Sequence, residues 1–323
     1  MHRRTFLNAT LSVPLALTCM RAQAQPFPSQ PVRWVVPYPP GGSTDTVART
    51  LASQMAPTLG QPVIVENKPG AGSNIGTESV IRAPADGHTL LLAVPPLSVN
   101  QALYPDLGFD ALKQLQAVCL LAWNPNVLVV PANSPIRTAQ ELLDQARAQP
   151  DTVTIASPGV GTVPHLVSLL IGQDLGIRVV PVPYKGSAAL MPDLISGRVY
   201  SAMDNLFAQL SPIRSGRVRA LATLGNTRSA LLPDIPSMAE LGLSDLVGMG
   251  WIGAVVRADV PQGHRTKLEE ALMRAVNVPS VREKLESMGL EVVAQGHEPF
   301  QKFMLHEANR WQGTIRRAGV SLG

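Results

Sequence analysis

The chain has 323 residues, of which 45% are hydrophobic, 15% are charged and 4% are aromatic, and this length is sufficient for two domains. Its 29 prolines and 26 glycines stay below the fraction that marks low-complexity sequence, so we expect a folded protein. The net charge of +4 falls to +1 without the three arginines of the first 24 residues, which leaves no basic stripe for binding nucleic acid.

The first 24 residues have the layout of an export signal. The basic pair Arg3-Arg4 precedes an apolar run from Leu11 to Leu17, and Ala22-Gln23-Ala24 offers a small-x-small cleavage site. We expect an exported protein that is cleaved after about Ala24. The basic pair also fits a twin-arginine signal, and the choice between the Tat and Sec routes stays open.

Short β-branched runs then alternate with longer helical patterns, which is typical of parallel sheets covered by helices. The first unit is predicted to contain strands at 32–36, 62–66 and 89–94, with helices at 46–55 and 74–82. A second unit repeats this plan, with strands at 152–156, 178–182 and 200–203, a helix at 164–171 and a short helix after Ser187. The repetition predicts two α/β lobes.

Two long apolar runs, 118–130 and 248–256, are predicted to be strands that cross between the lobes. Each is followed by a proline and a helix, at 139–148 and 267–276. Lobe 1 is predicted to comprise residues 25–123 and 248–323, and lobe 2 residues 124–247. Two connections make a hinge rather than a free linker. We expect the amphipathic segment 299–318 to form a last helix that packs on lobe 1.

Four glycine loops follow the predicted strands, and each leads into a helix. They contain Gly41-Gly42, Gly70 to Gly72, Gly159 to Gly161, and Gly186. Because parallel strands present their carboxyl ends to ligands, we expect these loops to face one cleft. The unpaired N–H groups and partial positive charge of a helix start favour an anion, so the loops predict an anion site that needs no arginine.

Several polar residues near these loops allow two interpretations. Asp45 either complements the helix dipole or, beside a bound anion, turns back to the backbone or meets a ligand ammonium or hydroxyl. His165 is either a ligand contact or a satisfied core histidine. Asp204-Asn205 follow a strand end and are expected to contact the ligand, whereas Lys185 also fits a solvated loop residue. Trp251 is equally compatible with the hinge core and with the wall of the cleft.

Other sites are not supported by the sequence. Neither Gly70 to Gly76 nor Gly159 to Pro164 keeps the Gly-x-Gly-x-x-Gly spacing of a dinucleotide site, and no phosphate-binding P-loop or Gly-x-Ser-x-Gly elbow occurs. The histidines after residue 24 show no close pair with metal-ligand spacing. We therefore expect no cofactor and no metal.

Four motifs in register resemble the Bug family, the extracytoplasmic solute receptors of tripartite tricarboxylate transporters. They are PYPPGGSTDTVAR at 37–49, ENKPGAGSNIGT at 66–77, VPYKGS at 182–187 and LPDIPS at 232–237. The similarity implies a type II periplasmic binding protein of the Venus-flytrap kind, located in the periplasm, with two crossing strands as its hinge. Pro192, five residues after Ser187, departs from the expected pattern and puts the length of that helix in doubt.

The resemblance implies a small carboxylate as ligand: a di- or tricarboxylate, an acidic amino acid or an aromatic acid. It also implies a monomer that is not an enzyme and that works with the membrane permease of such a transporter. The candidate ligand-binding residues are Tyr38, Gly41, Gly42, Ser43, Thr44, Asp45, Ala71, Gly72, Ser73, Asn74, Ser157, Gly159, Thr162, His165, Tyr184, Lys185, Gly186, Asp204 and Asn205.

Two alternative functions remain open at this stage. The closed receptor could dock on a periplasmic sensor domain instead of a permease, which the sequence does not decide. A periplasmic hydrolase on the same scaffold would use His165 with a serine of the cleft.

Overall fold

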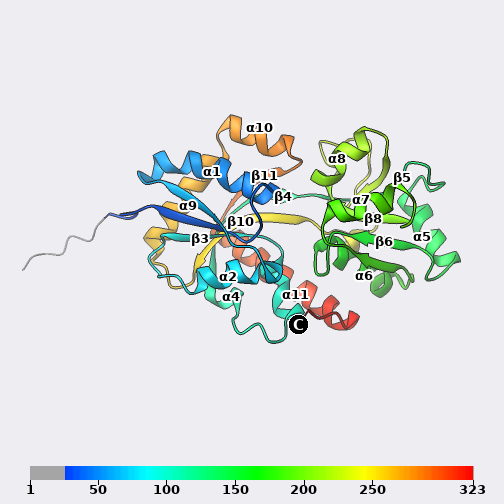
Figure 1. The fold of residues 1–323 in the computed structure, drawn as a ribbon, viewed down its shortest axis with the longest axis horizontal. Helices are drawn as coiled ribbons and strands as arrows, with labels where there is room; N and C mark the ends of the chain where they lie inside the picture. The colour runs from blue at the N-terminus through cyan, green and yellow to red at the C-terminus, as the bar shows by residue number, and fades with distance from the viewer. Residues whose placement is uncertain (1–25, 323) are drawn as a thin grey trace, which may run out of the picture.

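The computed structural model describes residues 26–322. The predicted export signal, its cleavage site after Ala24 and the twin-arginine motif lie outside these residues. The described chain forms two α/β lobes side by side, each with its own sheet (Figure 1).

The first sheet has six strands in the order β11-β4-β10-β3-β1-β2. Its parallel part joins β1 (Val32–Val36), β2 (Val63–Asn67) and β3 (Thr89–Ala93), while β10 (Gly250–Arg257) runs antiparallel to β3. The strands β4 (Leu115–Asn124) and β11 (Glu291–Gly296) complete it, again antiparallel. Its helices are α1 (Ser43–Leu59), α2 (Asn74–Ile81), α3 (Pro96–Leu103), α4 (Ala111–Gln114), α9 (Gln262–Val276) and α10 (Pro279–Ser287).

The second sheet has five strands in the order β7-β6-β8-β5-β9. Here β6 (Thr154–Ser157) pairs in parallel with β7 (Val180–Pro183) and β8 (Ser201–Asn205), and β5 (Asn126–Pro131) runs antiparallel to β8 and β9 (Val218–Thr223). Its helices are α5 (Ala139–Ala148), α6 (Val163–Leu175), α7 (Ser187–Ile195) and α8 (Leu206–Arg214). Three parallel strands flanked by an antiparallel one recur in both sheets, so the two lobes share one plan.

Apolar side chains explain why these segments form the cores of the sheets. Strand β3 is buried along its whole length, as expected for a strand covered by helices on both faces, and Leu51 and Met55 of α1 pack against one of these faces. Helix α7 contains Pro192 in its interior and still continues to Ile195. Leu190 and Leu194 are fully buried and hold the helix, so the proline did not shorten it.

The chain passes between the sheets where strands end. Strand β4 finishes at Asn124 and β5 begins at Asn126, while the segment after β9 returns through Gly248 to β10. In Figure 1, β4 and β10 run side by side toward the second lobe. These are the two crossings that the apolar runs indicated.

The last helix, α11 (His297–Ala318), differs from its expected placement on lobe 1 alone. Its first half inserts Phe300 and Met304 into a core of the first lobe. Trp311 and Ile315 are buried in another core, which combines side chains of the second lobe with Val99 and Leu103 of α3. Figure 1 shows its C-terminal turns reaching below α6. The amphipathic pattern showed that one stripe is buried, but not that its two ends meet different lobes.

Candidate ligand-binding cleft

A cleft of about 820 Å³ lies between the two lobes. Loops that follow β1, β3, β6 and β7 line it, together with the strand ends at Asn124, Asn126 and Asn205 and the start of β10. The parallel strands of both sheets thus present their carboxyl ends to one space, as such α/β folds do when they bind ligands.

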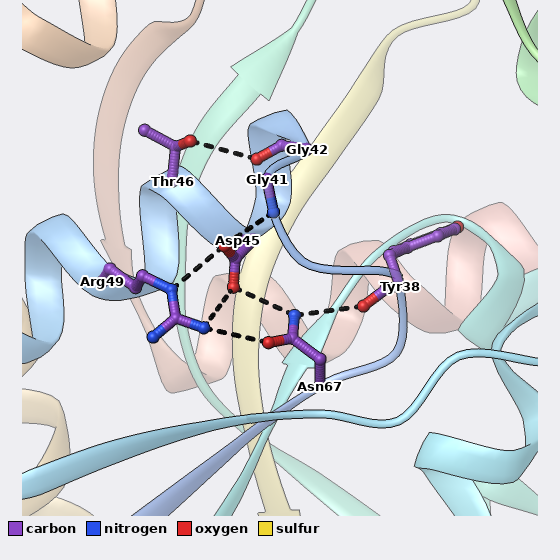
Figure 2. Close-up of polar contacts among 7 residues, drawn as sticks. All are labelled: Tyr38, Gly41, Gly42, Asp45, Thr46, Arg49 and Asn67. Carbon is purple, nitrogen blue, oxygen red and sulfur yellow. Dashed lines mark hydrogen bonds and ion pairs between the residues drawn. The ribbon is translucent and has the colours of Figure 1, made fainter.

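On lobe 1, the loop after β1 is held in place by the carboxylate of Asp45 (Figure 2). Its Oδ2 accepts hydrogen bonds from the Gly41 N–H at 2.9 Å and from Arg49 Nε at 3.0 Å, and its Oδ1 accepts one from Asn67 Nδ2 at 2.9 Å. Asn67 also donates to the Tyr38 carbonyl. The side chain is only 4% exposed and points back into lobe 1, so its charge is neutralised beside the cleft rather than offered to a ligand.

This arrangement leaves neutral donors on the cleft side of the same loop. The backbone N–H groups of Ser43 and Thr44, in the first turn of α1, have no hydrogen-bond partner within residues 26–322. Desolvation raises the pKa of the Tyr38 phenol to about 12, so its hydroxyl keeps its proton. All three residues line the cleft.

On lobe 2, helix α7 begins opposite α1. The N–H groups of Ser187 and Ala188 are likewise free of partners in the described chain, and both residues line the cleft. The Ser187 hydroxyl donates to Asp204 Oδ1 at 2.7 Å. Asp204 is fully buried and also accepts from Gln209 Nε2 and the Asn205 N–H, while its burial raises the pKa of the carboxyl.

The cleft itself carries no formal charge. Among its lining residues, all within the described range, there is no lysine, arginine, histidine, aspartate or glutamate. Its walls contain Val94, Val163, Ile252 and several prolines. An anion here would be held by helix starts and hydroxyl groups, which donate hydrogen bonds without a counter-charge.

The cleft brings together fewer than half of the candidate residues. Those that line it are Tyr38, Gly41, Gly42, Ser43, Thr44, Thr162, Gly186 and Asn205. Those outside its lining are Asp45, Ala71, Gly72, Ser73, Asn74, Ser157, Gly159, His165, Tyr184, Lys185 and Asp204. Three of the four glycine loops therefore reach this cleft.

The loop from Gly70 to Ser73 does not line the cleft, because α3 holds it. Asn100 Nδ2 donates to the Gly72 carbonyl at 2.8 Å and to Asn74 Oδ1 at 2.7 Å. All four residues of the loop have positive φ, including Ala71 at 46° and Ser73 at 81°. Such a backbone is costly for residues other than glycine and persists only where its surroundings impose it.

His165 lies behind the cleft wall, 4% exposed, and its Nδ1 accepts a hydrogen bond from the Gly161 N–H at 3.2 Å. Burial lowers its pKa, which favours the neutral imidazole. The imidazole nitrogen that could accept a proton, Nδ1, is thus already bonded to the backbone N–H of Gly161. This geometry does not support His165 as the base of a hydrolase.

Several lining residues were missed or left open by the sequence, among them Ser187 and Ala188 at the start of α7. Asn124 and Asn126 stand inside the apolar run 118–130 and are not among the candidate residues, yet both line the cleft. Trp251 also lines it, and its ring packs edge-on against Phe300 with centroids 5.4 Å apart. It therefore belongs both to the core beside the hinge and to the cleft wall.

Residues 26–322 contain no group of three or more histidine, cysteine, aspartate or glutamate side chains that could hold a metal ion. None of the helices in this range is both long and apolar enough to span a membrane.

We expect Asp45→Asn to lower the free energy of unfolding at pH 7 by about 1 to 2 kcal/mol, because it removes the ion pair and weakens the bond to Gly41. The hydrogen bonds from Arg49 lower the Asp45 pKa from 3.8 to about 2. The folded pKa is below the unfolded one, so this stability is present above pH 4 and is lost as the pH falls toward 2. Urea unfolding of the parent protein and of Asp45→Asn at pH 7 and at pH 2.5 measures this difference in stability.

Asp144→Asn is the matched control for this substitution. Asp144 pairs with Arg147 on an exposed helix face, where both side chains are about half exposed, and such a pair contributes little. If both variants lose the same free energy of unfolding at pH 7, Asp45 does not stabilise the loop after β1. The same conclusion follows if the loss in Asp45→Asn, relative to the parent protein, is as large at pH 2.5 as at pH 7.

The fold and the cleft together define a two-lobed solute-binding protein. Residues 47–320 match the family described as the tripartite tricarboxylate transporter family receptor. The match covers most of the sequence, and the chain belongs to this family.

Relatives and solved structures agree with this assignment. The chain is 35% identical over 326 residues to protein BugT of Bordetella pertussis, covering 98% of this chain and 99% of BugT. It is similar to MatC from Rhodopseudomonas palustris with bound malate, with 30% identity, a TM-score of 0.76, and coverage of 90% of this chain and 100% of MatC. It is also similar to R. palustris Rpa4515 with adipate, with 29% identity, a TM-score of 0.79, and coverage of 91% and 99%.

Proposed function

We propose that this protein is a periplasmic receptor that captures a small organic carboxylate in the cleft and delivers it to the membrane permease of a tripartite tricarboxylate transporter. The observation that carries the proposal is the uncharged cleft into which the starts of α1 and α7 bring four free N–H groups. Membership in the receptor family supports it, as do the malate and the adipate bound by two similar proteins.

Capture requires contacts from both lobes. We assign residues 25–123 and 248–323 to lobe 1 and residues 124–247 to lobe 2, with α11 touching both. A ligand carboxylate between Ser43 and Thr44 on one side and Ser187 and Ala188 on the other would favour the closed form, because it gains bonds that the open form does not offer. The receptor role needs no catalytic group in the cleft.

Isothermal titration calorimetry of refolded, ligand-free protein tests the proposal. A panel of mono-, di- and tricarboxylates is compared with neutral sugars and with amines at the same concentrations. Saturable binding of at least one carboxylate, and of no sugar or amine, is the expected result. Binding of only amines or only sugars would overturn the carboxylate proposal.

A further inference from the structure

The floor of the cleft carries three asparagines from three different strand ends. Asn124 ends β4, Asn126 begins β5 and Asn205 ends β8, and all three line the cleft. Asn126 and Asn205 are direct register partners, and Asn124 Nδ2 donates to Asn205 Oδ1 at 3.3 Å. We call these three residues the asparagine cluster.

The hydrogen bonds of the cluster leave two oxygens without a partner. Asn126 Nδ2 donates to the Gly248 carbonyl at 2.8 Å, and a carbonyl can only accept, so the orientation of this amide is fixed. Its Oδ1 is buried and lacks a hydrogen-bond partner in the described part of the chain, as does Asn124 Oδ1. Asn126 is only 1% exposed. A buried acceptor left unpaired is destabilising, and such groups in native proteins require an explanation.

The unpaired atoms of the cluster are amide oxygens, which accept hydrogen bonds and therefore favour a donor over a second anion. The buried Asp204 carboxylate lies next to Asn205 and accepts its N–H at 2.8 Å. The same Asp204 oxygen accepts the Ser187 hydroxyl, and no lysine, arginine or histidine of residues 26–322 lines the cleft. A carboxylate placed at the cluster would face two amide oxygens, with no cation in the described cleft lining.

We propose that the asparagine cluster is a second subsite that selects a neutral O–H or N–H donor on the ligand. This inference rests on the proposed function, in which the ligand carboxylate binds at the starts of α1 and α7. The ligand is then a monocarboxylate with an apolar body, which contacts Val94, Val163 and Ile252, and with a hydroxyl or amide N–H at the far end. It differs in this respect from malate and adipate, the dicarboxylates bound by the two similar proteins.

Two ligand series of constant body test the subsite by calorimetry. One consists of hexanoate, 6-hydroxyhexanoate and adipate, and the other of benzoate, 4-hydroxybenzoate and terephthalate. The two bodies differ in length and stiffness, so that a poor fit of one does not decide the outcome. We expect the hydroxyl member of at least one series to bind tenfold or more tightly than both of its partners.

Variants connect this preference to the cluster. Asn124→Leu and Asn126→Leu each keep the size of the side chain and remove the unpaired oxygen, and we expect the hydroxyl preference to fall below threefold. Asn124→Leu leaves the bond between Asn126 and Gly248 intact, so it remains informative if Asn126→Leu fails to fold. Asn309→Leu, at an exposed position of α11, is the control and should keep the full preference.

The outcomes separate the two proposals. Tighter binding of adipate and terephthalate than of the hydroxyl members would overturn the subsite and leave the carboxylate receptor standing. The subsite is also overturned if the hydroxyl preference survives in both asparagine variants. If no member of either series binds and the wider carboxylate panel is also negative, both proposals fall.

Discussion

Ser43→Pro is expected to weaken carboxylate binding about 10- to 100-fold while leaving the free energy of unfolding within about 0.5 kcal/mol of the parent protein. The substitution deletes the free N–H at the first position of α1, and a hydrogen bond to a charged acceptor contributes about 1.5 to 3 kcal/mol. The fold should accept the substitution, because proline is common at the first residue of a helix. The preceding Gly42 has φ −77° and ψ 174°, the extended conformation that a following proline requires.

Two controls isolate the N–H group. Ser43→Ala removes the hydroxyl and keeps the N–H, so its loss of affinity should be smaller than that of Ser43→Pro. Gln262→Pro places a proline at the same position of α9, remote from the cleft, after Pro261 with φ −54° and ψ 138°. It should leave affinity unchanged. The affinities are measured by calorimetry with the carboxylate of the panel that binds most tightly. An unaltered affinity in Ser43→Pro would show that the start of α1 does not bind the ligand.

The parts of the fold that local pattern determines were predictable from the sequence. The bounds of β1 and α5 coincide with the predicted 32–36 and 139–148. A β-branched run and an amphipathic repeat predict such elements well, because both patterns depend only on residues close together in the sequence. Helix α8 and the edge strand β11 were not assigned. Helix α8 is nine residues long with Pro212 inside it, and most of β11 is half-buried, so neither has a strong periodic pattern.

The candidate site was predictable only where backbone groups form it. The glycine loops of β1, β6 and β7 reach the cleft because the loop after a parallel strand must emerge at that edge. The directions of polar side chains depend on partners far away in sequence. Asn126 is oriented by a carbonyl 122 residues later, and the Gly72 loop is held by Asn100, 28 residues away. A single sequence does not reveal such pairs, which is why Asn124 and Asn126 were not among the candidate residues.

The position of α11 across both lobes has a consequence for stability that the sequence did not indicate. Trp311 is fully buried in the core that combines side chains of the second lobe with α3, and its Nε1 donates to Glu307 Oε2 at 2.8 Å. Glu307 is itself only 5% exposed. Removing the indole therefore creates a cavity in this shared core and leaves a buried carboxylate with a weaker set of partners.

We expect Trp311→Ala to lower the free energy of unfolding by about 3 to 5 kcal/mol, the range for truncating a large buried aromatic side chain. Urea unfolding followed by circular dichroism measures the loss. Leu305→Ala on the same helix is the control, since Leu305 is 44% exposed and should cost below about 1 kcal/mol. Hydrogen exchange should also accelerate in the last two turns of α11 and not around Phe300, because only the C-terminal half is anchored by Trp311. A loss as small as that of Leu305→Ala would mean that α11 does not hold the second lobe.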